Sequence, residues 1–300
     1  MLAGLVASQA YAPAYAQAAR TFVSSSGNDA NPCSRQAPCR SFAIAITKTA
    51  AGGEINTLDP GGYGAFEITK AISIVSGLGE AGVLVPEGGT GILVNAGAND
   101  AINLRGLAIE GAGLGLQGIR FNTGGSLTIT NSVIRNMSGG TGIDFRPQAE
   151  SYLTISDTLV ADNGSLGIHI FPQTSGTANA YLNRVIASRH QWGFFVDGSV
   201  SGTAGPSAVI VDSAAVNNTT GLGIGVSAEQ AKVVIRHSDM TGNKVGLNGR
   251  SGNVELAQST IAQNGTGIKC VQSILQSYHD NIVFRNNVDG EGCLTGNTFR

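Results

Sequence analysis

The stretch SGGTGIDFRP, residues 138–147, joins a glycine-rich turn to a short alternating segment, and it decides how the chain folds. Its pair Gly142-Ile143 is followed by Asp144 and Arg146, with a phenylalanine between them. Apolar and charged side chains therefore alternate, which predicts a strand with one buried face and one outward face. Near-copies of the glycine–isoleucine pair occur on both sides of this stretch, so the local pattern belongs to a repeat.

The repeated unit is a glycine followed by an apolar residue, at intervals of roughly 20 to 30 residues, a spacing that indicates stacked supersecondary units. In most units a hexamer ending in Asn precedes the pair, and in VIASRH (185–190) His190 takes the Asn place. The glycines of the pairs are Gly91, Gly118, Gly142, Gly167, Gly193, Gly223, Gly246 and Gly267. The hexamers are NSVIRN (131–136), TLVADN (158–163), SAAVNN (213–218), SDMTGN (238–243) and STIAQN (259–264).

Alternating segments such as LTIT (127–130), LTIS (153–156) and VELA (254–257) lie between the repeats, and no unit shows a helical period. Short strands at this spacing predict an all-β fold, a parallel β-helix of about eight to ten coils that pair with one another. Asn suits the turns because it tolerates left-handed backbone angles and because stacked Asn side chains hydrogen-bond from coil to coil. A leucine-rich repeat would need a more regular leucine pattern, and a β-propeller would need longer repeats.

The two ends of the chain resemble those of exported bacterial members of the right-handed parallel β-helix, or pectin-lyase-like, superfamily. The resemblance rests on TFVSSSGNDANPCSRQAPCRSFAIAITKTAAGGEINTLDPGGYGAFEITKAISIVSG (21–77) and on SYHDNIVFRNNVDGEGC (277–293). It implies one solenoid domain over residues 21–300, with an N-terminal cap over about 21–60 and a C-terminal cap over about 272–300. The resemblance is specific for the fold alone, because this fold hosts lyases, hydrolases, adhesins and proteins without known activity.

A short helix is expected within the N-terminal cap, over residues 41–50. Ser41 is its N-cap and Gly52-Gly53 end it. The helix would cover the open end of the stack, because an uncapped solenoid exposes both its core and its strand edges.

The first residues and the cysteines both point to export. Residues 1–20 are alanine-rich, and AYA (14–16) has the small-x-small form of a cleavage site, so we interpret this segment as the remnant of a signal peptide. The four cysteines fit an oxidising periplasmic or extracellular location.

Two of the cysteines lie close together in the sequence near each end of the chain, although four cysteines allow three disulfide pairings. Local disulfides would staple both ends of the molecule, at about 2–4 kcal/mol each. Zinc binding is disfavoured because no C-x-x-C pair occurs, and buried free thiols are the remaining alternative. The cysteines are Cys33, Cys39, Cys270 and Cys293.

Strand alternation also predicts which side chains face outward. If Ile143 points inward, Asp144 and Arg146 point outward beside the equivalent residues of adjacent coils, whereas a one-residue slip would bury Arg120, Asp144 and His169 together. The first outward column is then Leu93, Arg120, Asp144, His169, Phe195, Gly225, Asn248 and Lys269. The second is Asn95, Asn122, Arg146, Phe171, Asp197, Ser227, Arg250 and Val271.

Composition narrows the classes of partner. Charged residues make up 13% of the 300 residues, the formal net charge is −2, and no basic run occurs, so a nucleic-acid partner is disfavoured. No apolar run is long enough to span a bilayer.

The outward cluster of charges and aromatic rings favours, as a first hypothesis, a non-enzymatic protein that binds a polysaccharide or a cell-surface glycan. Aromatic rings stack on sugars, and Arg forks pair with uronic acid carboxylates. A plain ladder of opposite charges on a solvated sheet is the structural alternative. The binding residues would be Arg120, Asn122, Phe171, Phe195 and Asp197.

The second hypothesis is a polysaccharide lyase or glycoside hydrolase that uses Asp144, His169 and Arg146. No metal site and no cofactor are expected, except that lyases of this superfamily commonly use calcium, and the chain shows only scattered Asp for it. The third hypothesis is an adhesin or a structural spike subunit. It would predict a trimer, whereas the others fit a monomer or a trimer.

Overall fold

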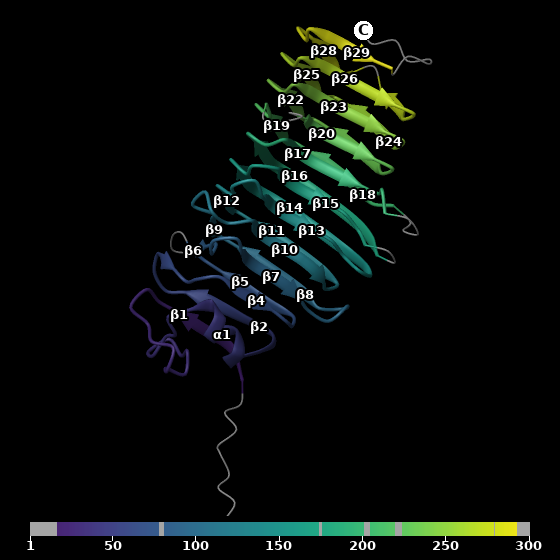
Figure 1. The fold of residues 1–300 in the computed structure, drawn as a ribbon. Helices are drawn as coiled ribbons and strands as arrows, with labels where there is room; N and C mark the ends of the chain where they lie inside the picture. The colour runs from purple at the N-terminus through teal and green to yellow at the C-terminus, as the bar shows by residue number, and fades with distance from the viewer. Residues whose placement is uncertain are drawn as a thin grey trace, which may run out of the picture.

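The computed structural model describes residues 17–77, 81–173, 176–200, 205–219, 224–278 and 280–292. Over these residues the chain winds into a parallel β-solenoid, with the N-terminal coils at one end and the C-terminal coils at the other (Figure 1). Strands of successive coils pair in parallel to form a 19-stranded sheet and a ten-stranded sheet in the described part of the chain. The predicted all-β parallel solenoid is therefore confirmed, and the ten-stranded sheet agrees with the predicted number of coils.

The ten-stranded sheet takes one strand from each coil and carries the predicted outward columns. Its strands are β4 (Phe66–Ile68), β7 (Thr90–Asn95), β10 (Gln117–Thr123), β13 (Thr141–Phe145), β15 (Leu166–Ile170), β17 (Trp192–Asp197), β20 (Ile224–Glu229), β23 (Val245–Arg250), β26 (Thr266–Val271) and β29 (Val288–Glu291).

The 19-stranded sheet contains the remaining strands and bends at residues with positive φ, such as Asp157 and Asp212. Its strands are β1 (Ala18–Val23), β2 (Thr49–Thr57), β3 (Gly61–Gly62), β5 (Ile72–Val75), β6 (Ala81–Leu84), β8 (Ala101–Arg105), β9 (Leu107–Glu110), β11 (Ser126–Thr130), β12 (Val133–Arg135), β14 (Glu150–Ala161), β16 (Thr177–Ser188), β18 (Ser207–Val211), β19 (Ala214–Val216), β21 (Lys232–Arg236), β22 (Asp239–Thr241), β24 (Asn253–Ala257), β25 (Thr260–Ala262), β27 (Ile274–Ser277) and β28 (Ile282–Phe284).

The register of the ten-stranded sheet follows the prediction from β10 to β17. Ile119 pairs with Ile143, Ile143 with Ile168, and Ile168 with Phe194, and all four side chains are buried. Equivalent apolar residues thus stack inside the solenoid, while the following residue of each strand lies on the outer face.

The glycine of the repeated glycine–apolar pair lies at a corner of the coil. Glycine is required there because adjacent coils approach each other closely. A Cβ on Gly142 would lie 2.7 Å from the carbonyl oxygen of Gly167 and 2.6 Å from Val160 Cγ1. The same approach links Gly193 to Gly225 and Gly225 to Gly246.

The prediction that Gly223 is the corner glycine of its coil is therefore wrong by two residues, since Gly225 lies between Gly193 and Gly246. The segment LGIGV (222–226) contains two glycine–apolar pairs, and a shift of two residues keeps the alternation intact. Phe195 consequently pairs with Ser227 and Asp197 with Glu229, not with Gly225 and Ser227 as expected.

A ladder of buried Asn side chains closes the corner of the later coils. Asn218 Nδ2 donates to Asn243 Oδ1 (2.9 Å), and Asn243 Nδ2 donates to Asn264 Oδ1 (3.0 Å). Each Oδ1 also accepts the backbone N–H of the preceding coil's ladder residue. The coil-to-coil bonding predicted for these Asn residues is confirmed.

The ladder departs from the prediction at two places. Asn136 lies one residue too early, and Met137 takes the ladder position, where its N–H donates to Asn163 Oδ1 (3.1 Å). His190 occupies the rung after Asn163 as predicted: Nδ1 lies 3.2 Å from Asn163 N and Nε2 lies 3.1 Å from the carbonyl oxygen of Val160. Within the described residues, Asn163 Nδ2 has no hydrogen-bond partner, because His190 Nδ1 already accepts the backbone N–H of Asn163 and Nε2 faces the carbonyl oxygen of Val160.

Helix α1 (Phe42–Lys48) covers the N-terminal end of the stack. Ser41 is its N-cap, as predicted, and accepts a hydrogen bond from Ile44 N. Phe42 packs against Tyr63, with ring centroids 5.0 Å apart. The helix ends before Gly52-Gly53, contrary to expectation, because Thr49 already starts β2.

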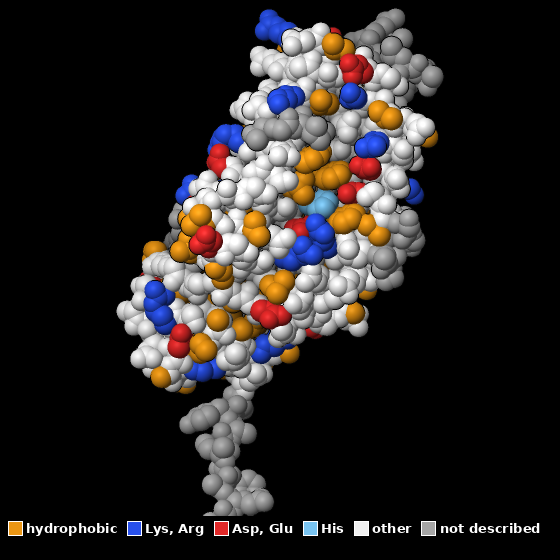
Figure 2. All heavy atoms as spheres, in the orientation of Figure 1, with side chains coloured by type: hydrophobic (Ala, Val, Ile, Leu, Met, Phe, Trp, Pro, Cys, Tyr) orange, Lys and Arg blue, Asp and Glu red, His pale blue; other side chains and the backbone are white. Residues whose placement is uncertain are grey.

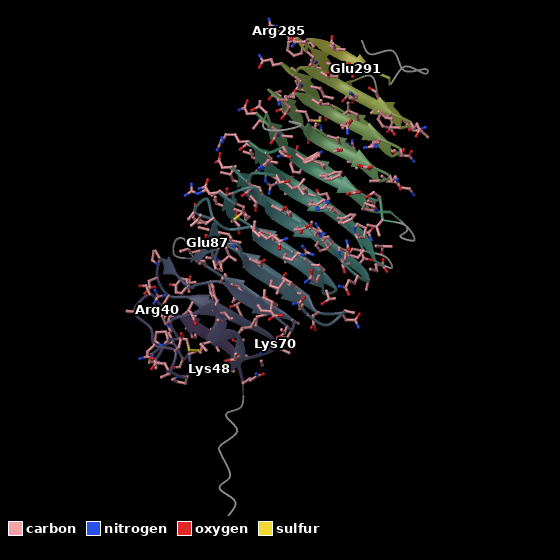
Figure 3. All side chains as sticks on the ribbon, viewed as in Figure 1. Arg40, Lys48, Lys70, Glu87, Arg285 and Glu291 are labelled. Carbon is pink, nitrogen blue, oxygen red and sulfur yellow. A yellow bond between two sulfur atoms is a disulfide. The ribbon has the colours of Figure 1, made fainter. Side chains whose placement is uncertain are left out.

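The cap is tied together by further polar contacts. Thr49 is the C-cap of the helix, and its Oγ1 donates to the carbonyl oxygen of Ala45 (2.7 Å). Lys48, which is labelled in Figure 3, donates to the carbonyl oxygen of Asp29 (2.7 Å). The predicted Cys33–Cys39 disulfide is present, with the Cα atoms 4.6 Å apart. Cys270 is also a disulfide cysteine, whereas Cys293 lies outside the described residues.

We expect Gly142→Ala to lower the free energy of unfolding by about 2 kcal/mol, because the added methyl group overpacks the corner against backbone of the next coil. Gly62→Ala is the matched control, since no atom lies within 4 Å of the Cβ it would add. Urea denaturation measures both variants, and equal stability would contradict the close-approach explanation.

We expect His190→Asn to remove a pH-dependent loss of stability. Burial lowers the pKa of His190 in the folded protein, so the unfolded chain binds a proton first as the pH falls. The wild type should therefore lose about 1 kcal/mol relative to His190→Asn between pH 7.5 and 5.5. Urea denaturation at both pH values tests this, with the exposed His237→Asn as control, and parallel pH profiles of wild type and His190→Asn would contradict it.

Candidate functional site

The outer face of the ten-stranded sheet carries a cluster of charged and aromatic side chains on β10, β13, β15 and β17. Figure 2 shows Lys or Arg, Asp or Glu, His and hydrophobic side chains gathered over the middle of this face. Direct pairing of Arg120 with Asp144, Asp144 with His169 and His169 with Phe195 aligns the first outward column. The structure thus brings together the predicted residues on four adjacent coils.

Asp144 is the centre of the cluster, and its side chain accepts hydrogen bonds from four neighbours. Arg120 Nη1 (2.8 Å) and Arg146 Nε (2.8 Å) donate to different carboxylate oxygens. His169 Nδ1 lies 3.1 Å from Oδ1, and Gln117 Nε2 donates to Oδ2 from 3.2 Å. Only 1% of Asp144 is exposed, so this carboxylate lies below the surface although its strand position is outward.

Burial and the neighbouring cationic side chains have opposite effects on the pKa of Asp144. Burial by itself would raise the pKa of the carboxyl group, but the hydrogen bonds and charges of His169 and Arg146 outweigh it and lower the pKa. Asp144 is therefore a carboxylate over the physiological range, and it holds both guanidinium groups in place.

His169 links Asp144 to a second carboxylate. Its Nε2 lies 3.7 Å from Asp197 Oδ2, and its ring stacks with Phe171 and with Phe195 at centroid distances of 5.0 and 5.1 Å. His169 is 4% exposed and Asp197 is 8% exposed. The structural alternative of a solvated ladder of charges does not fit these three buried groups.

The two arginines form the polar surface of the cluster. Their side chains are 25% (Arg120) and 29% (Arg146) exposed. Arg120 Nε donates to Asn122 Oδ1 (2.8 Å), and the Arg146 guanidinium lies 5.0 Å from the centroid of the Phe171 ring. The terminal nitrogens of Arg146 make no hydrogen bond to the described residues and remain available for a ligand.

Two residues of the cluster were missed by the alternation argument. In β10 and β17 the corner glycine and the residue after it both face inward, so Gln117 and Trp192, which precede the glycine, also face outward. Trp192 stacks on Phe195 with centroids 5.6 Å apart. The signal in the sequence was the glycine itself, because a glycine facing the interior breaks the simple alternation.

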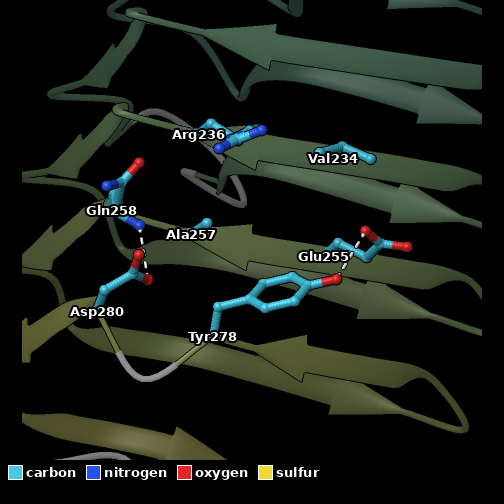
Figure 4. Close-up of a pocket in the computed structure, with 7 residues that line it drawn as sticks. All are labelled: Val234, Arg236, Glu255, Ala257, Gln258, Tyr278 and Asp280. Carbon is cyan, nitrogen blue, oxygen red and sulfur yellow. Dashed lines mark hydrogen bonds between the residues drawn. The ribbon is translucent and has the colours of Figure 1, made fainter.

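A separate depression lies on the 19-stranded sheet (Figure 4). Tyr278 Oη donates to Glu255 Oε2 (3.3 Å), and Asp280 Oδ1 accepts from Gln258 N (2.9 Å). Arg236 and these side chains are exposed, so this depression lacks a buried charged centre like Asp144.

In the described segments, no group of three or more His, Cys, Asp or Glu side chains is placed to hold a metal ion. The one helix of these segments, α1, is too short to cross a membrane.

The parallel β-solenoid defines the class of this protein. The family model described as "Right handed beta helix region" matches residues 90–261, more than half of the chain. The chain therefore belongs to the right-handed β-helix family, as its two ends suggested. A comparison with curated proteins finds no match.

Solved structures of similar fold include enzymes named for acidic polysaccharides. Pectate lyase Pel9A is 19% identical with a TM-score of 0.66, over 92% of this chain and 81% of that chain. The alginate lyase from Paenibacillus sp. str. FPU-7 is 15% identical with a TM-score of 0.62, over 90% and 99%. The mannuronan C-5 epimerase AlgE6 A-module of Azotobacter vinelandii is 16% identical with a TM-score of 0.56, over 85% and 93%. At these identities the likeness shows the fold.

We expect Asp144→Asn to lower the free energy of unfolding by about 2 kcal/mol, because two arginines and His169 lose their shared counter-charge. Asp157→Asn is the matched control, since Asp157 pairs with Arg184 on an exposed bend and should contribute little. Denaturant titration tests both variants. An equal decrease in the free energy of unfolding of both variants would contradict the claim that the buried Asp144 network stabilises the fold more than an exposed ion pair does.

Proposed function

We propose that the protein acts on a uronate-containing polysaccharide, which binds across the ten-stranded sheet through Arg120 and Arg146. The observation that carries the proposal is the pair of half-buried guanidinium groups fixed by the buried Asp144. A ligand at this face meets N–H donors and aromatic rings, while the carboxylate that holds the arginines is hidden beneath them.

Uronate chains offer the matching chemistry. Their repeated carboxylates suit the planar donor fork of arginine. The terminal nitrogens of Arg146 make no hydrogen bond to the described part of the chain, so they can form such a bidentate contact. Asn122 lies beside Arg120 and would bind sugar hydroxyls, while Phe171 and Phe195 supply the apolar surface of the same face. The two arginines thus supply the positive charge that would bind the uronate carboxylates.

Two comparisons of fold support this substrate class, since pectate and alginate are both polyuronates and the proteins named for them are lyases. We therefore include cleavage of the chain by a lyase reaction in the proposal. Asp144, a catalytic candidate in the sequence, is assigned the role of positioning the two arginines, because its carboxylate is buried and both of its oxygens accept hydrogen bonds from neighbouring side chains.

Binding without cleavage is the second candidate, and one observation favours it. Both ring nitrogens of His169 face carboxylates and the side chain is buried, so this histidine is not placed as a free general base. Release of unsaturated uronate products separates the two candidates: cleavage generates ultraviolet-absorbing fragments, and a binding protein generates none.

We expect the wild type to bind polygalacturonate or alginate and Arg146→Ala to bind at least about tenfold more weakly, since a charge-assisted bidentate contact is lost. Arg184→Ala is the matched control, because Arg184 pairs with Asp157 on the other sheet and should leave binding unchanged. Isothermal titration at fixed ionic strength measures the affinities, with a neutral glucan as reference. Equal binding of the glucan, or unchanged binding by Arg146→Ala, would refute the proposal.

Export to the periplasm or the cell exterior is part of the same proposal, because polyuronates occur outside cells and the buried Cys33–Cys39 disulfide suits an oxidising compartment. Fractionation of the cells that make the protein naturally, with detection by antibody, tests it, and recovery of the protein only from the cytoplasm would contradict it.

A further inference from the structure

His169 occupies an unusual position, with a carboxylate opposite each of its ring nitrogens. Nδ1 lies 3.1 Å from Asp144 Oδ1, and Nε2 lies 3.7 Å from Asp197 Oδ2. Nε2 is buried and makes no hydrogen bond within the described residues. The stacked rings of Phe171 and Phe195 help to exclude water from the imidazole.

This geometry favours the doubly protonated ring. Ionised carboxylates only accept hydrogen bonds, so Nδ1 must carry a proton toward Asp144. In a neutral imidazole the remaining lone pair on Nε2 would face the carboxylate of Asp197, and two acceptors would oppose each other in a buried site. A proton on Nε2 removes this conflict and turns it into an attraction.

The proton on His169 also determines the charge of the cluster. From β13, Asp144 and Arg146 face the imidazole, and from β17 Asp197 faces it, while Arg120 of β10 reaches it through Asp144. With His169 protonated, three positive groups outweigh two carboxylates. When His169 loses its proton the cluster becomes neutral overall, and Asp197 loses its cationic neighbour.

We propose that protonation of His169 controls polyanion binding at this site, so that the protein holds acidic polysaccharide at acidic to neutral pH and releases it at alkaline pH. This inference rests on the proposed function of the arginine cluster. Uronate carboxylates stay ionised from pH 5.5 upward, so a change of affinity in this range comes from the protein.

The pKa of His169 agrees in direction. Burial would lower this pKa, but the carboxylates of Asp144 and Asp197 opposite the two ring nitrogens outweigh burial and raise it above its ordinary value. The charged form is therefore complete below the ordinary value and is lost as the pH rises through the raised value.

Titration of polygalacturonate against the wild type from pH 5.5 to 9 at constant ionic strength tests the proposal. We expect the dissociation constant to rise about tenfold toward alkaline pH, whereas His169→Gln should bind weakly with no such dependence. His237→Gln is the matched control, because His237 is exposed on the other sheet and should keep the wild-type profile. Far-UV circular dichroism verifies that each protein stays folded over the range.

The histidine resonances of the wild type give a second readout that needs no ligand and no variant at position 169. The imidazole of His169 should titrate above the ordinary pKa of histidine, and the His190→Asn variant identifies the signal of the other buried histidine. A pH-independent affinity of the wild type, a normal profile of His169→Gln, or a His169 imidazole that is neutral at pH 6 would each overturn the proposal. Absence of polyanion binding at every pH would instead refute the proposed function, even if the imidazole titrates as expected.

Discussion

Direct stacking of equivalent residues in successive coils is the constraint on which the rest of the structure depends. Parallel strands of adjacent coils lie about 4.8 Å apart. Each residue of a strand therefore lies next to the equivalent residues of the two neighbouring coils. The close approach of each corner glycine to the next coil holds this register. If the coils were offset, Asp144 would meet neither Arg120 nor His169, and the cluster would not exist.

Burial gives the cluster its character. A lone aspartate on a solvated sheet would be a weak partner, but Asp144 is covered by the very groups it binds, and its negative charge is shared among two arginines and a histidine. The surface above it is consequently cationic and pre-organised. Little rearrangement is then required when an anionic ligand replaces water on the arginines.

Much of this arrangement is readable from the sequence because a strand period of two is simple to follow. The inward and outward residues from Arg120 to Asp197 follow from it, and so does the meeting of Asp144 with its neighbours. The alternation cannot choose between registers that differ by two residues: Val226 points inward whether Gly223 or Gly225 is at the corner, and only packing against the adjacent coil selects Gly225.

Other features depend on three-dimensional packing that no periodicity encodes. The burial of His169 arises from the rings of Phe171 and Phe195, and the outward position of Trp192 arises from the corner glycine that follows it. A search for Asn residues also cannot predict that Met137 occupies a position of the ladder. Sequence patterns therefore placed the candidate residues on one face, whereas their contacts and exposure required the structure.

The central claim is that the arginines held by Asp144 form the binding site for a polyuronate. A crystal structure of the protein with a short oligogalacturonate tests it most directly. The account predicts a uronate carboxylate within hydrogen-bond distance of the terminal nitrogens of Arg120 or Arg146, on the outer face of the ten-stranded sheet. An oligosaccharide bound instead in the depression beside Arg236 and Tyr278, with the arginine cluster unoccupied, would contradict it.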